Sequence, residues 1–244
     1  MAMLTAAALH DLLVRALTTA GFSAENAGAL ARQTVLAEEL GQQNVGVAHV
    51  FDYTEGLAAG RIDGLAVPAI SKPLPTMIQV DGHGGLAQSG FDRAFDDLVD
   101  SARRLGLALF VHKNAMLCGA LGTYALRLAE AGLVAIAATN GSPLLAGSGS
   151  KNPVFCTNPL AFAAPQANGP PLLIDQSSSA TAYVNIRAAA ERGEDIPLDW
   201  ALDKEGEPTV DPKAALQGTL LPFAGPRGAN IALMVEVLAA GLGG

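Results

Sequence analysis

The chain has 244 residues, half of them hydrophobic and 16% charged, and its formal net charge is −8 at pH 7. This composition is typical of a globular protein with one large or two small domains, and it excludes a disordered chain. No run of lysine and arginine offsets the negative charge, which argues against a nucleic-acid partner. The apolar runs are shorter than a membrane span, and Cys118 and Cys156 match neither a disulfide scaffold nor a metal motif. We therefore expect a cytoplasmic protein with no membrane or metal site.

The N-terminal region is predicted to be helical. The spacing of apolar residues predicts a helix over residues 4–20, with Leu12, Leu13 and Leu17 on its buried face, followed by an N-cap at Ser23. Asp11 interrupts the apolar residues, so this segment is interpreted as a folded helix and not as a signal peptide. Further helices are expected over residues 23–40 and 46–58, and Glu38 is interpreted as a solvent-exposed charge.

Strands and helices then alternate, which is typical of the α/β class. Residues 139–153 form a long Gly/Ser/Asn stretch that we expect to be a functional or mobile loop. No G-x-G-x-x-G motif occurs, so a Rossmann site is disfavoured. Before this loop the expected order of elements is strand 77–80, helix 90–105, strand 107–111, helix 119–131 and strand 133–138.

Residues 155–181 carry the most informative pattern in the chain. Asn158 precedes Pro159, which favours extended geometry at Asn158, and two buried strands are expected at 160–164 and 172–174. A serine-rich loop, residues 176–180, then leads into a helix over 181–192. Such a loop before a helix N-terminus suits an anion, although an ordinary serine N-cap on a surface helix would give the same pattern.

This pattern resembles the malate/L-lactate dehydrogenase family. The family sequence G-T-N-P-x-A-F-A-x-P corresponds to residues 156–165, and D-M-A-T-S corresponds to residues 175–179. The resemblance continues through 200–209 and 211–216. It implies a non-Rossmann α/β fold with a predominantly antiparallel mixed sheet and flanking helices. It also implies a homodimer that uses NADPH or NADH to reduce a small 2-imino or 2-keto acid.

The family's acid/base relay is replaced in this chain. The resemblance aligns Asn44 with the relay serine, Val45 with the proton-donating histidine, and His49 with the arginine that binds the substrate carboxylate. Asn185 is aligned with the relay aspartate. Thr157 matches a substrate-contacting threonine. A protonated His49 can take over the binding of a carboxylate, although His49 can also be an ordinary surface histidine on a helix.

The positions that bind the cofactor in the family are partly kept. Glycines and small residues remain in the loop before the helix expected at 119–131, although Met116 and Leu117 replace two histidines. The resemblance implies cofactor contacts at Leu117, Cys118, Gly119, Ala120, Leu121, Asp175, Gln176, Ser177, Pro226 and Arg227.

The final apolar helix is expected over residues 231–240. Family members continue further, so the resemblance predicts that their C-terminal part is absent here. We expect a helical N-terminal region (1–66), an α/β cofactor-binding core (67–224) and a C-terminal helix (225–244).

The lack of a proton-donating side chain at Val45 favours one class of substrate. Reduction of a keto acid needs a proton donor for the forming alkoxide, and valine cannot supply one. A cyclic imine can arrive already protonated, so the sequence favours Δ1-pyrroline-2-carboxylate or Δ1-piperideine-2-carboxylate as substrate. The alternatives are a 2-hydroxyacid dehydrogenase with a relocated acid and a non-catalytic dimeric homologue.

Overall fold

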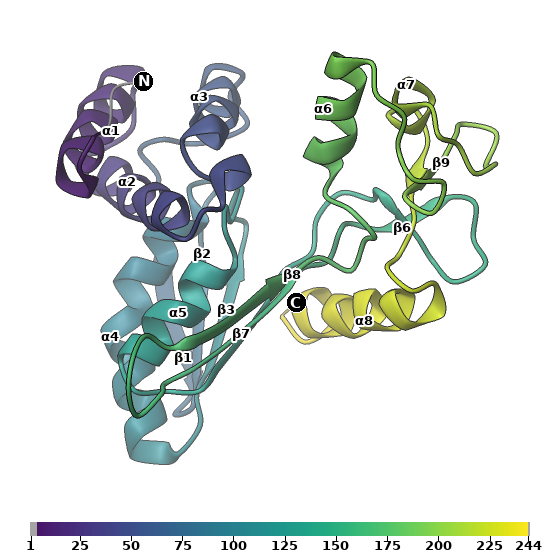
Figure 1. The fold of residues 1–244 in the computed structure, drawn as a ribbon. Coiled ribbons are helices and arrows are strands. Elements are labelled where there is room, and N and C mark those ends of the chain that lie inside the picture. Colours follow the sequence, from purple (N-terminus) through teal and green to yellow (C-terminus); the bar gives the residue numbers. More distant parts are fainter. Residues whose placement is uncertain (1–3, 244) are drawn as a thin grey trace. The chain divides into compact units, whose positions relative to one another are not determined.

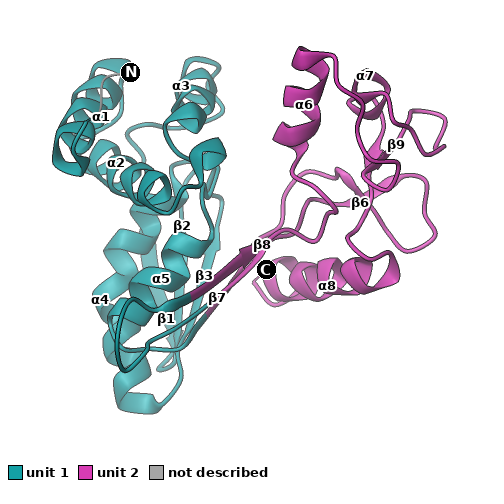
Figure 2. Cartoon of the chain, viewed as in Figure 1, with its two compact units in different colours: residues 1–135, 163–172 teal, residues 136–162, 173–244 magenta. Residues whose placement is uncertain are grey.

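The structure, a computed structural model, describes residues 4–243 and divides into two compact units (Figures 1 and 2). Unit 1 comprises residues 1–135 and 163–172, and unit 2 comprises residues 136–162 and 173–244. The chain passes between the units within the strands of one three-stranded sheet, in the order β4-β7-β8. The division expected at residues 66 and 224 stays a prediction.

Unit 1 begins with two helices that pack on each other, α1 (Ala6–Ala20) and α2 (Ala24–Glu39). Gly21 ends α1 in the left-handed conformation (φ 117°), and the Ser23 side chain caps α2 by accepting from the Asn26 amide. Leu13 and Leu17 lie in the core that the two helices share, as predicted, but Leu12 is 45% exposed. Helix α3 (Val50–Ala58) adds Tyr53 to the same core.

A second layer of unit 1 is a sheet of β1 (Ala69–Leu74), β2 (Met77–Asp81) and β3 (Leu109–Lys113). Strand β1 pairs antiparallel with β2, and β2 pairs parallel with β3. Helix α4 (Ala87–Leu105) packs against all three strands, and α5 (Gly122–Glu130) packs against α2. Strand β1 was not predicted, because Pro73 lies within it and the segment remains exposed at the sheet edge.

Unit 2 contains a four-stranded sheet in the order β6-β5-β10-β9. Its core includes Leu145, Ile186 and Ala232, which come from a strand and two helices. Its strands are β5 (Leu145–Ala146), β6 (Pro153–Phe155), β9 (Ala201–Leu202) and β10 (Thr219–Leu220). Its helices are α6 (Tyr183–Arg192), α7 (Pro212–Ala215) and α8 (Pro226–Glu236), and α8 continues into a π turn at Val237–Gly241.

The central sheet is formed by β4 (Ala135–Ala138), β7 (Leu160–Ala164) and β8 (Leu172–Gln176). Strand β7 is confirmed, but β8 is not a buried strand, because Leu172 and Ile174 are 45% and 46% exposed. The expected loop at 139–153 contains the short strand β5.

The mixed α/β class is confirmed, with antiparallel and parallel pairs in small sheets and helices beside them. Across residues 4–243, every helix is too short or too polar to span a bilayer.

Candidate active site

In unit 1, residues 117–121 form a tight loop immediately before α5. Leu117 and Gly119 both have positive φ, 49° and 67°. A Cβ at Gly119 would lie 2.9 Å from Gln33 Oε1 and 3.1 Å from Tyr53 Oη, so glycine alone fits this position. Ala120 and Leu121 are buried, whereas Leu117 is 37% exposed. Ala120 and Leu121 can therefore offer little more than their backbone atoms to a ligand.

Hydrogen bonds from buried hydroxyl and amide side chains fix the carbonyl groups of this loop. Tyr53 Oη donates to Leu117 O at 3.2 Å, and Gln88 Nε2 donates to Tyr53 Oη at 2.7 Å. Tyr124 Oη donates to Cys118 O at 2.8 Å. Burial raises the pKa of both tyrosines well above its ordinary value, so both phenols remain protonated donors. The carbonyls of the loop are thereby fixed from the protein side.

His49 lies beside the same tyrosine. Its ring meets the Tyr53 ring edge-on, with 5.1 Å between centroids, and its Nδ1 lies 2.6 Å from Asp52 Oδ2. Its Nε2 has no hydrogen-bond partner within residues 4–243. A histidine whose Nδ1 is held by a carboxylate has a fixed ring orientation, and its second nitrogen remains available to a ligand. Unit 1 therefore brings together His49 and the loop at Leu117.

The segment before His49 differs from its prediction. The helix expected at 46–58 begins as a 3₁₀ turn, Val47–His49, and becomes α-helical only at Val50. Glu38, interpreted as a solvent-exposed charge, is half-buried and accepts the Val47 amide at 2.7 Å. This carboxylate replaces a helical hydrogen bond that the 3₁₀ geometry leaves unmade.

Asn44 and Val45 lie in the preceding 3₁₀ turn, Gln43–Val45. Asn44 is exposed and Val45 is half-buried. Neither side chain can release a proton at neutral pH, so this turn cannot act as an acid.

In unit 2, the serine-rich loop is held by its own hydrogen bonds. Ser177 Oγ and Ser179 Oγ lie 2.9 Å apart, and Ser179 Oγ donates to Thr181 O at 2.6 Å. The Ser178 amide donates to Thr157 O at 2.8 Å. The N-cap of α6 is Ala182 and receives no side-chain hydrogen bond, so the alternative of an ordinary serine N-cap is wrong.

The start of α8 packs against this loop. The Phe223 amide donates to Ser178 O at 3.1 Å, and a Cβ at Gly228 would lie 2.9 Å from the same oxygen. Pro226 and Arg227 lie in the first turn of α8, which begins before the start expected at residue 231. Arg227 is exposed and has no ion pair or hydrogen bond within residues 4–243. A free guanidinium at a helix N-terminus suits a phosphate group.

Asn185, aligned with the relay aspartate, is exposed in the first turn of α6. Its Nδ2 donates to Thr181 Oγ1 at 3.0 Å. Asn185 belongs to unit 2, whereas Asn44 and His49 belong to unit 1.

Sequence reasoning missed the residues that support these groups. Asp52 could have been found, because it follows His49 by three residues on a predicted helix and can therefore meet it. Tyr53 and Gln88 contact Leu117 across 64 and 29 residues, and no local pattern signals such pairings.

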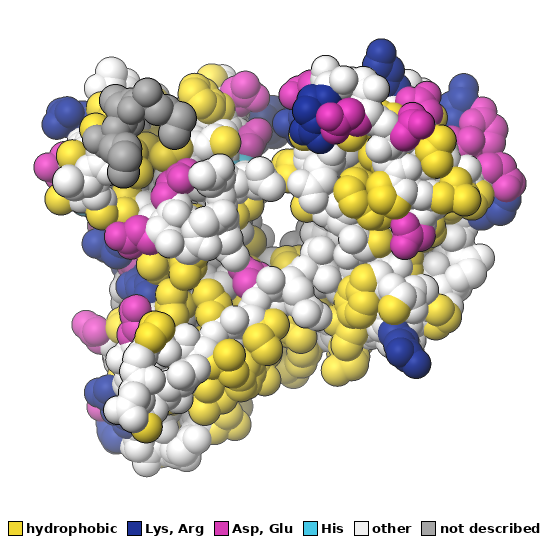
Figure 3. All heavy atoms as spheres, in the orientation of Figure 1, with side chains coloured by type: hydrophobic (Ala, Val, Ile, Leu, Met, Phe, Trp, Pro, Cys, Tyr) yellow, Lys and Arg dark blue, Asp and Glu magenta, His cyan; other side chains and the backbone are white. Residues whose placement is uncertain are grey.

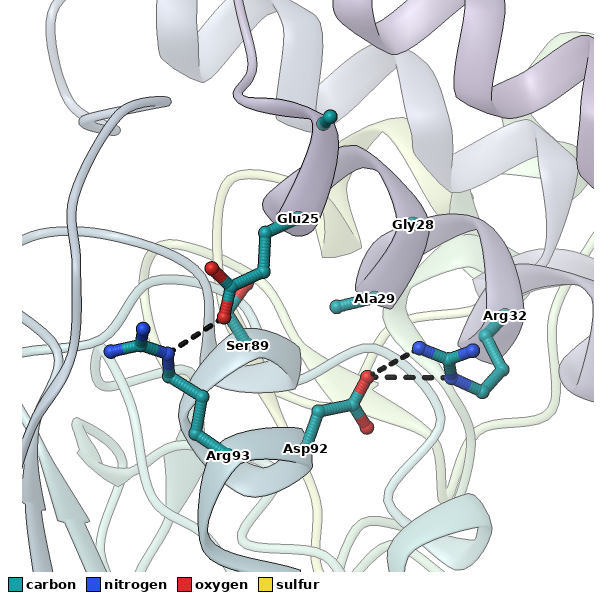
Figure 4. Close-up of a pocket in the computed structure, with 8 residues that line it drawn as sticks. Glu25, Gly28, Ala29, Arg32, Ser89, Asp92 and Arg93 are labelled. Carbon is teal, nitrogen blue, oxygen red and sulfur yellow. Dashed lines mark hydrogen bonds and ion pairs between the residues drawn. The ribbon is translucent and has the colours of Figure 1, made fainter.

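A separate hollow of about 350 Å³ lies between α2 and α4 (Figure 4). Its charged side chains pair with one another: Arg93 with Glu25 at 2.7 Å and Arg32 with Asp92 at 2.9 Å. None of the predicted site residues lines it, and we assign it no function. Within residues 4–243, no three His, Cys, Asp or Glu side chains gather as metal ligands would.

Comparison with known proteins gives a consistent result. The model of the malate/L-lactate dehydrogenase family matches residues 4–244. A Δ1-pyrroline-2-carboxylate/Δ1-piperideine-2-carboxylate reductase of Pseudomonas syringae pv. tomato is 37% identical over 97% of this chain and 69% of the relative. A (2R)-3-sulfolactate dehydrogenase (NADP⁺) of Chromohalobacter salexigens is 37% identical over 96% of this chain and 70% of its own length.

The similarity extends to three-dimensional structure. The crystal structure of Δ1-piperideine-2-carboxylate reductase from Pseudomonas syringae pvar. tomato matches with a TM-score of 0.97 and 36% identity, over all of this chain and 74% of that one. The family model, the relatives and this structural match confirm the resemblance found in residues 156–165 and 175–179. The chain belongs to the malate/L-lactate dehydrogenase family.

Proposed function

We propose that the protein is an NAD(P)H-dependent oxidoreductase that reduces a cyclic 2-imino acid to the L-amino acid. Δ1-Pyrroline-2-carboxylate and Δ1-piperideine-2-carboxylate are the proposed substrates. The similarity to a reductase of these two compounds supports the proposal. The observation that carries the substrate class is the turn at Asn44 and Val45, which contains no acid where the family relay has one.

The protein's residues suit a reaction that needs no proton from the enzyme. The nicotinamide cofactor, when bound, supplies the hydride. An iminium substrate already carries its proton on nitrogen, so the product is a neutral amine that water can protonate later. The protein then has to bind and orient its ligands, which can supply much of a rate enhancement. Val45 imposes no penalty on this reaction.

His49 is the proposed partner of the substrate carboxylate in unit 1, and Thr157 of unit 2 stays a substrate contact implied by the family resemblance. Asp52 holds His49 Nδ1, so Nε2 is the nitrogen that would donate to the carboxylate. Histidine binds a carboxylate as a cation only when it is protonated, so binding is expected to weaken toward alkaline pH.

The residues present fit a nicotinamide nucleotide. In unit 2, Asp175 lies in strand β8 and Ser177 in the serine-rich loop that follows it, and this loop packs against the first turn of α8. Arg227 in that turn offers an unpaired charge for a phosphate. These features would hold either NADPH or NADH.

A 2-hydroxyacid dehydrogenase is the second candidate. The His49–Asp52 pair could serve as the relocated acid of such an enzyme, and a sulfolactate dehydrogenase is among the relatives. A non-catalytic dimeric homologue is the third candidate. It is favoured because Asn44, Val45 and Asn185 replace family residues that can transfer a proton.

The test compares rates of NADPH oxidation with Δ1-pyrroline-2-carboxylate, Δ1-piperideine-2-carboxylate, pyruvate and oxaloacetate. We expect turnover of an imine to be fastest, and we expect imine reduction to persist in Val45→His. The lack of a general acid costs about 10²–10⁴ in rate, and this penalty falls on the keto acids alone. Faster turnover of a keto acid, or a kcat/KM that rises toward alkaline pH, would contradict the proposal.

A further inference from the structure

Asn158 has a conformation and a set of contacts that the sequence motif does not explain. It lies between Thr157 and Pro159, it is fully buried, and its φ is 37°. The residue before a proline normally adopts extended geometry, so the prediction of extended geometry at Asn158 is wrong. Among residues other than glycine, asparagine tolerates a positive φ best, but the conformation still costs free energy.

The Asn158 side chain joins the loop between β6 and β7 to α8. Its Nδ2 donates to Ala232 O and to Glu236 Oε2, both at 2.8 Å. The other oxygen of Glu236 accepts from Asn140 Nδ2 at 3.0 Å. Both amide protons of Asn158 are therefore used on one helix, and the Glu236 carboxylate is held by two asparagines.

The Asn158 backbone joins the same loop to the serine-rich loop. Ser178 Oγ donates to Asn158 O at 2.8 Å, and the Ser178 amide donates to Thr157 O at 2.8 Å. Ser178 O in turn accepts the Phe223 amide, just before α8 begins. Hydrogen bonds thus form one connected set: they link Asn158 to α8, Asn158 to Ser178, and Ser178 to the residue before α8.

This set meets three segments that carry the proposed ligand residues. Thr157 adjoins Asn158, residues 175–177 adjoin Ser178, and Pro226–Arg227 begin the helix that Asn158 binds. The Oδ1 of Asn158 is buried and has no hydrogen-bond partner within residues 4–243, which is a cost to stability. A residue that combines a positive φ with an unsatisfied buried oxygen is poorly explained by stability alone.

We propose that Asn158 is a positioning residue that sets the mutual placement of Thr157, residues 175–177 and Arg227, and so forms the nucleotide-binding part of unit 2. This role rests on the proposed function. Asparagine is required because it supplies two donors while tolerating positive φ. Aspartate has a similar shape, but it would bring a second carboxylate against Glu236 and would donate nothing to Ala232 O.

The test compares Asn158→Asp with a matched control, Asn26→Asp. Asn26 is similarly buried, in unit 1, and its Nδ2 also donates to two acceptors, Gly64 O at 2.8 Å and Ala66 O at 3.1 Å. Both variants lose a buried amide donor, so each should have a lower midpoint of thermal unfolding than the wild-type protein. Only Asn158→Asp should weaken NADPH or NADH binding, measured by calorimetry on folded protein, by at least about tenfold.

A second substitution should restore part of the nucleotide affinity that Asn158→Asp loses. Glu236→Gln combined with Asn158→Asp removes the repulsion between two carboxylates. The introduced amide can donate to the introduced carboxylate, while its carbonyl oxygen still accepts from Asn140. The double variant should regain part of the lost nucleotide affinity. Amide hydrogen exchange gives a readout that needs no nucleotide: exchange at Ser178 and Phe223 should rise in Asn158→Asp and remain unchanged in Asn26→Asp.

The possible outcomes distinguish the positioning role of Asn158 from the proposed function of the protein. Unchanged nucleotide affinity in folded Asn158→Asp, with wild-type protein binding normally, would overturn the positioning role alone. An equal loss of affinity in Asn26→Asp would show a general effect of lower stability, and it would overturn the role as well. Wild-type protein that binds neither NADPH nor NADH would overturn the proposed function and the role together.

Discussion

His49 is the residue through which substrate binding can be tested most simply. His49→Arg retains a cation at every accessible pH, so KM for the imino acid should vary less with pH than it does in wild type. His49→Gln should raise KM by about tenfold to a hundredfold, because a hydrogen bond to a charged group contributes about 1.5–3 kcal/mol. Steady-state kinetics across pH measures both effects. Equal KM values in wild type and His49→Gln would show that His49 does not bind the carboxylate.

His112 on β3 should make unit 1 sensitive to acid. Its half-buried ring lies against Gly90 of α4, and its buried Nε2 has no hydrogen-bond partner in the described part of the chain, residues 4–243. Burial lowers its pKa from 6.5 to about 4. The nearby Asp81 opposes this shift. Because the folded pKa lies below the unfolded one, stability is complete above pH 6.5 and falls as pH drops toward 4. The loss at the acid end is on the order of 3 kcal/mol.

Urea unfolding between pH 7 and pH 4 measures this loss. His112→Leu should flatten the pH dependence of the free energy of unfolding, because leucine has no charged form to bury. His10→Gln, which removes a partly exposed histidine of α1, is the control, and the slope should change more in His112→Leu than in His10→Gln. A slope in His112→Leu equal to that of wild type would refute the role of His112.

At the residue scale, sequence patterns predicted some features and missed others for physical reasons. The N-cap at Ser23 is confirmed, because capping depends on neighbouring residues only. Glu38 was misjudged, because its hydrogen bond to Val47 depends on a turn that helical periodicity does not reveal. Asn158 was misjudged because tertiary hydrogen bonds overcome the local preference for extended geometry.

At the element scale, two identical substitutions should have opposite effects. Gly28 lies inside α2 with nothing within 4 Å of an added Cβ, so Gly28→Ala should stabilise the protein by about 0.5–1 kcal/mol. At Gly228 in α8 the Cβ would lie 2.7 Å from Phe223 N and 2.9 Å from Ser178 O. Gly228→Ala should destabilise by about 1–3 kcal/mol. Urea unfolding of both variants checks the signs, and a stabilising Gly228→Ala would contradict the packing of α8.

The elements themselves were predicted where periodicity is long. Helices α1, α2 and α4 are confirmed within a few residues, because each presents several turns of apolar spacing. Strand β1 was missed because of Pro73, and β5 because two residues carry no period. The predicted site residues remain a prediction, since their roles come from the family resemblance and not from a pattern in the chain.

At the scale of the whole molecule, exposed apolar strands favour a dimer. Ile136 on β4 and Ile174 on β8 are 67% and 46% exposed, and Figure 3 shows apolar side chains at the surface in this view. Exposed apolar patches mark interaction sites. Light scattering should give twice the chain mass of 24.8 kDa. A monomer at every concentration would contradict the proposed homodimer.

The central claim is that this chain uses a nicotinamide nucleotide without a Rossmann motif. Calorimetric titration of the purified protein with NADPH and with NADH tests this claim most directly. The fit of Asp175, Ser177 and Arg227 in unit 2 to a nucleotide predicts saturable binding of NADPH, NADH or both, with a dissociation constant of about 1 μM to 1 mM, the range in which enzymes usually hold their substrates. No binding of either nucleotide up to millimolar concentration would contradict it.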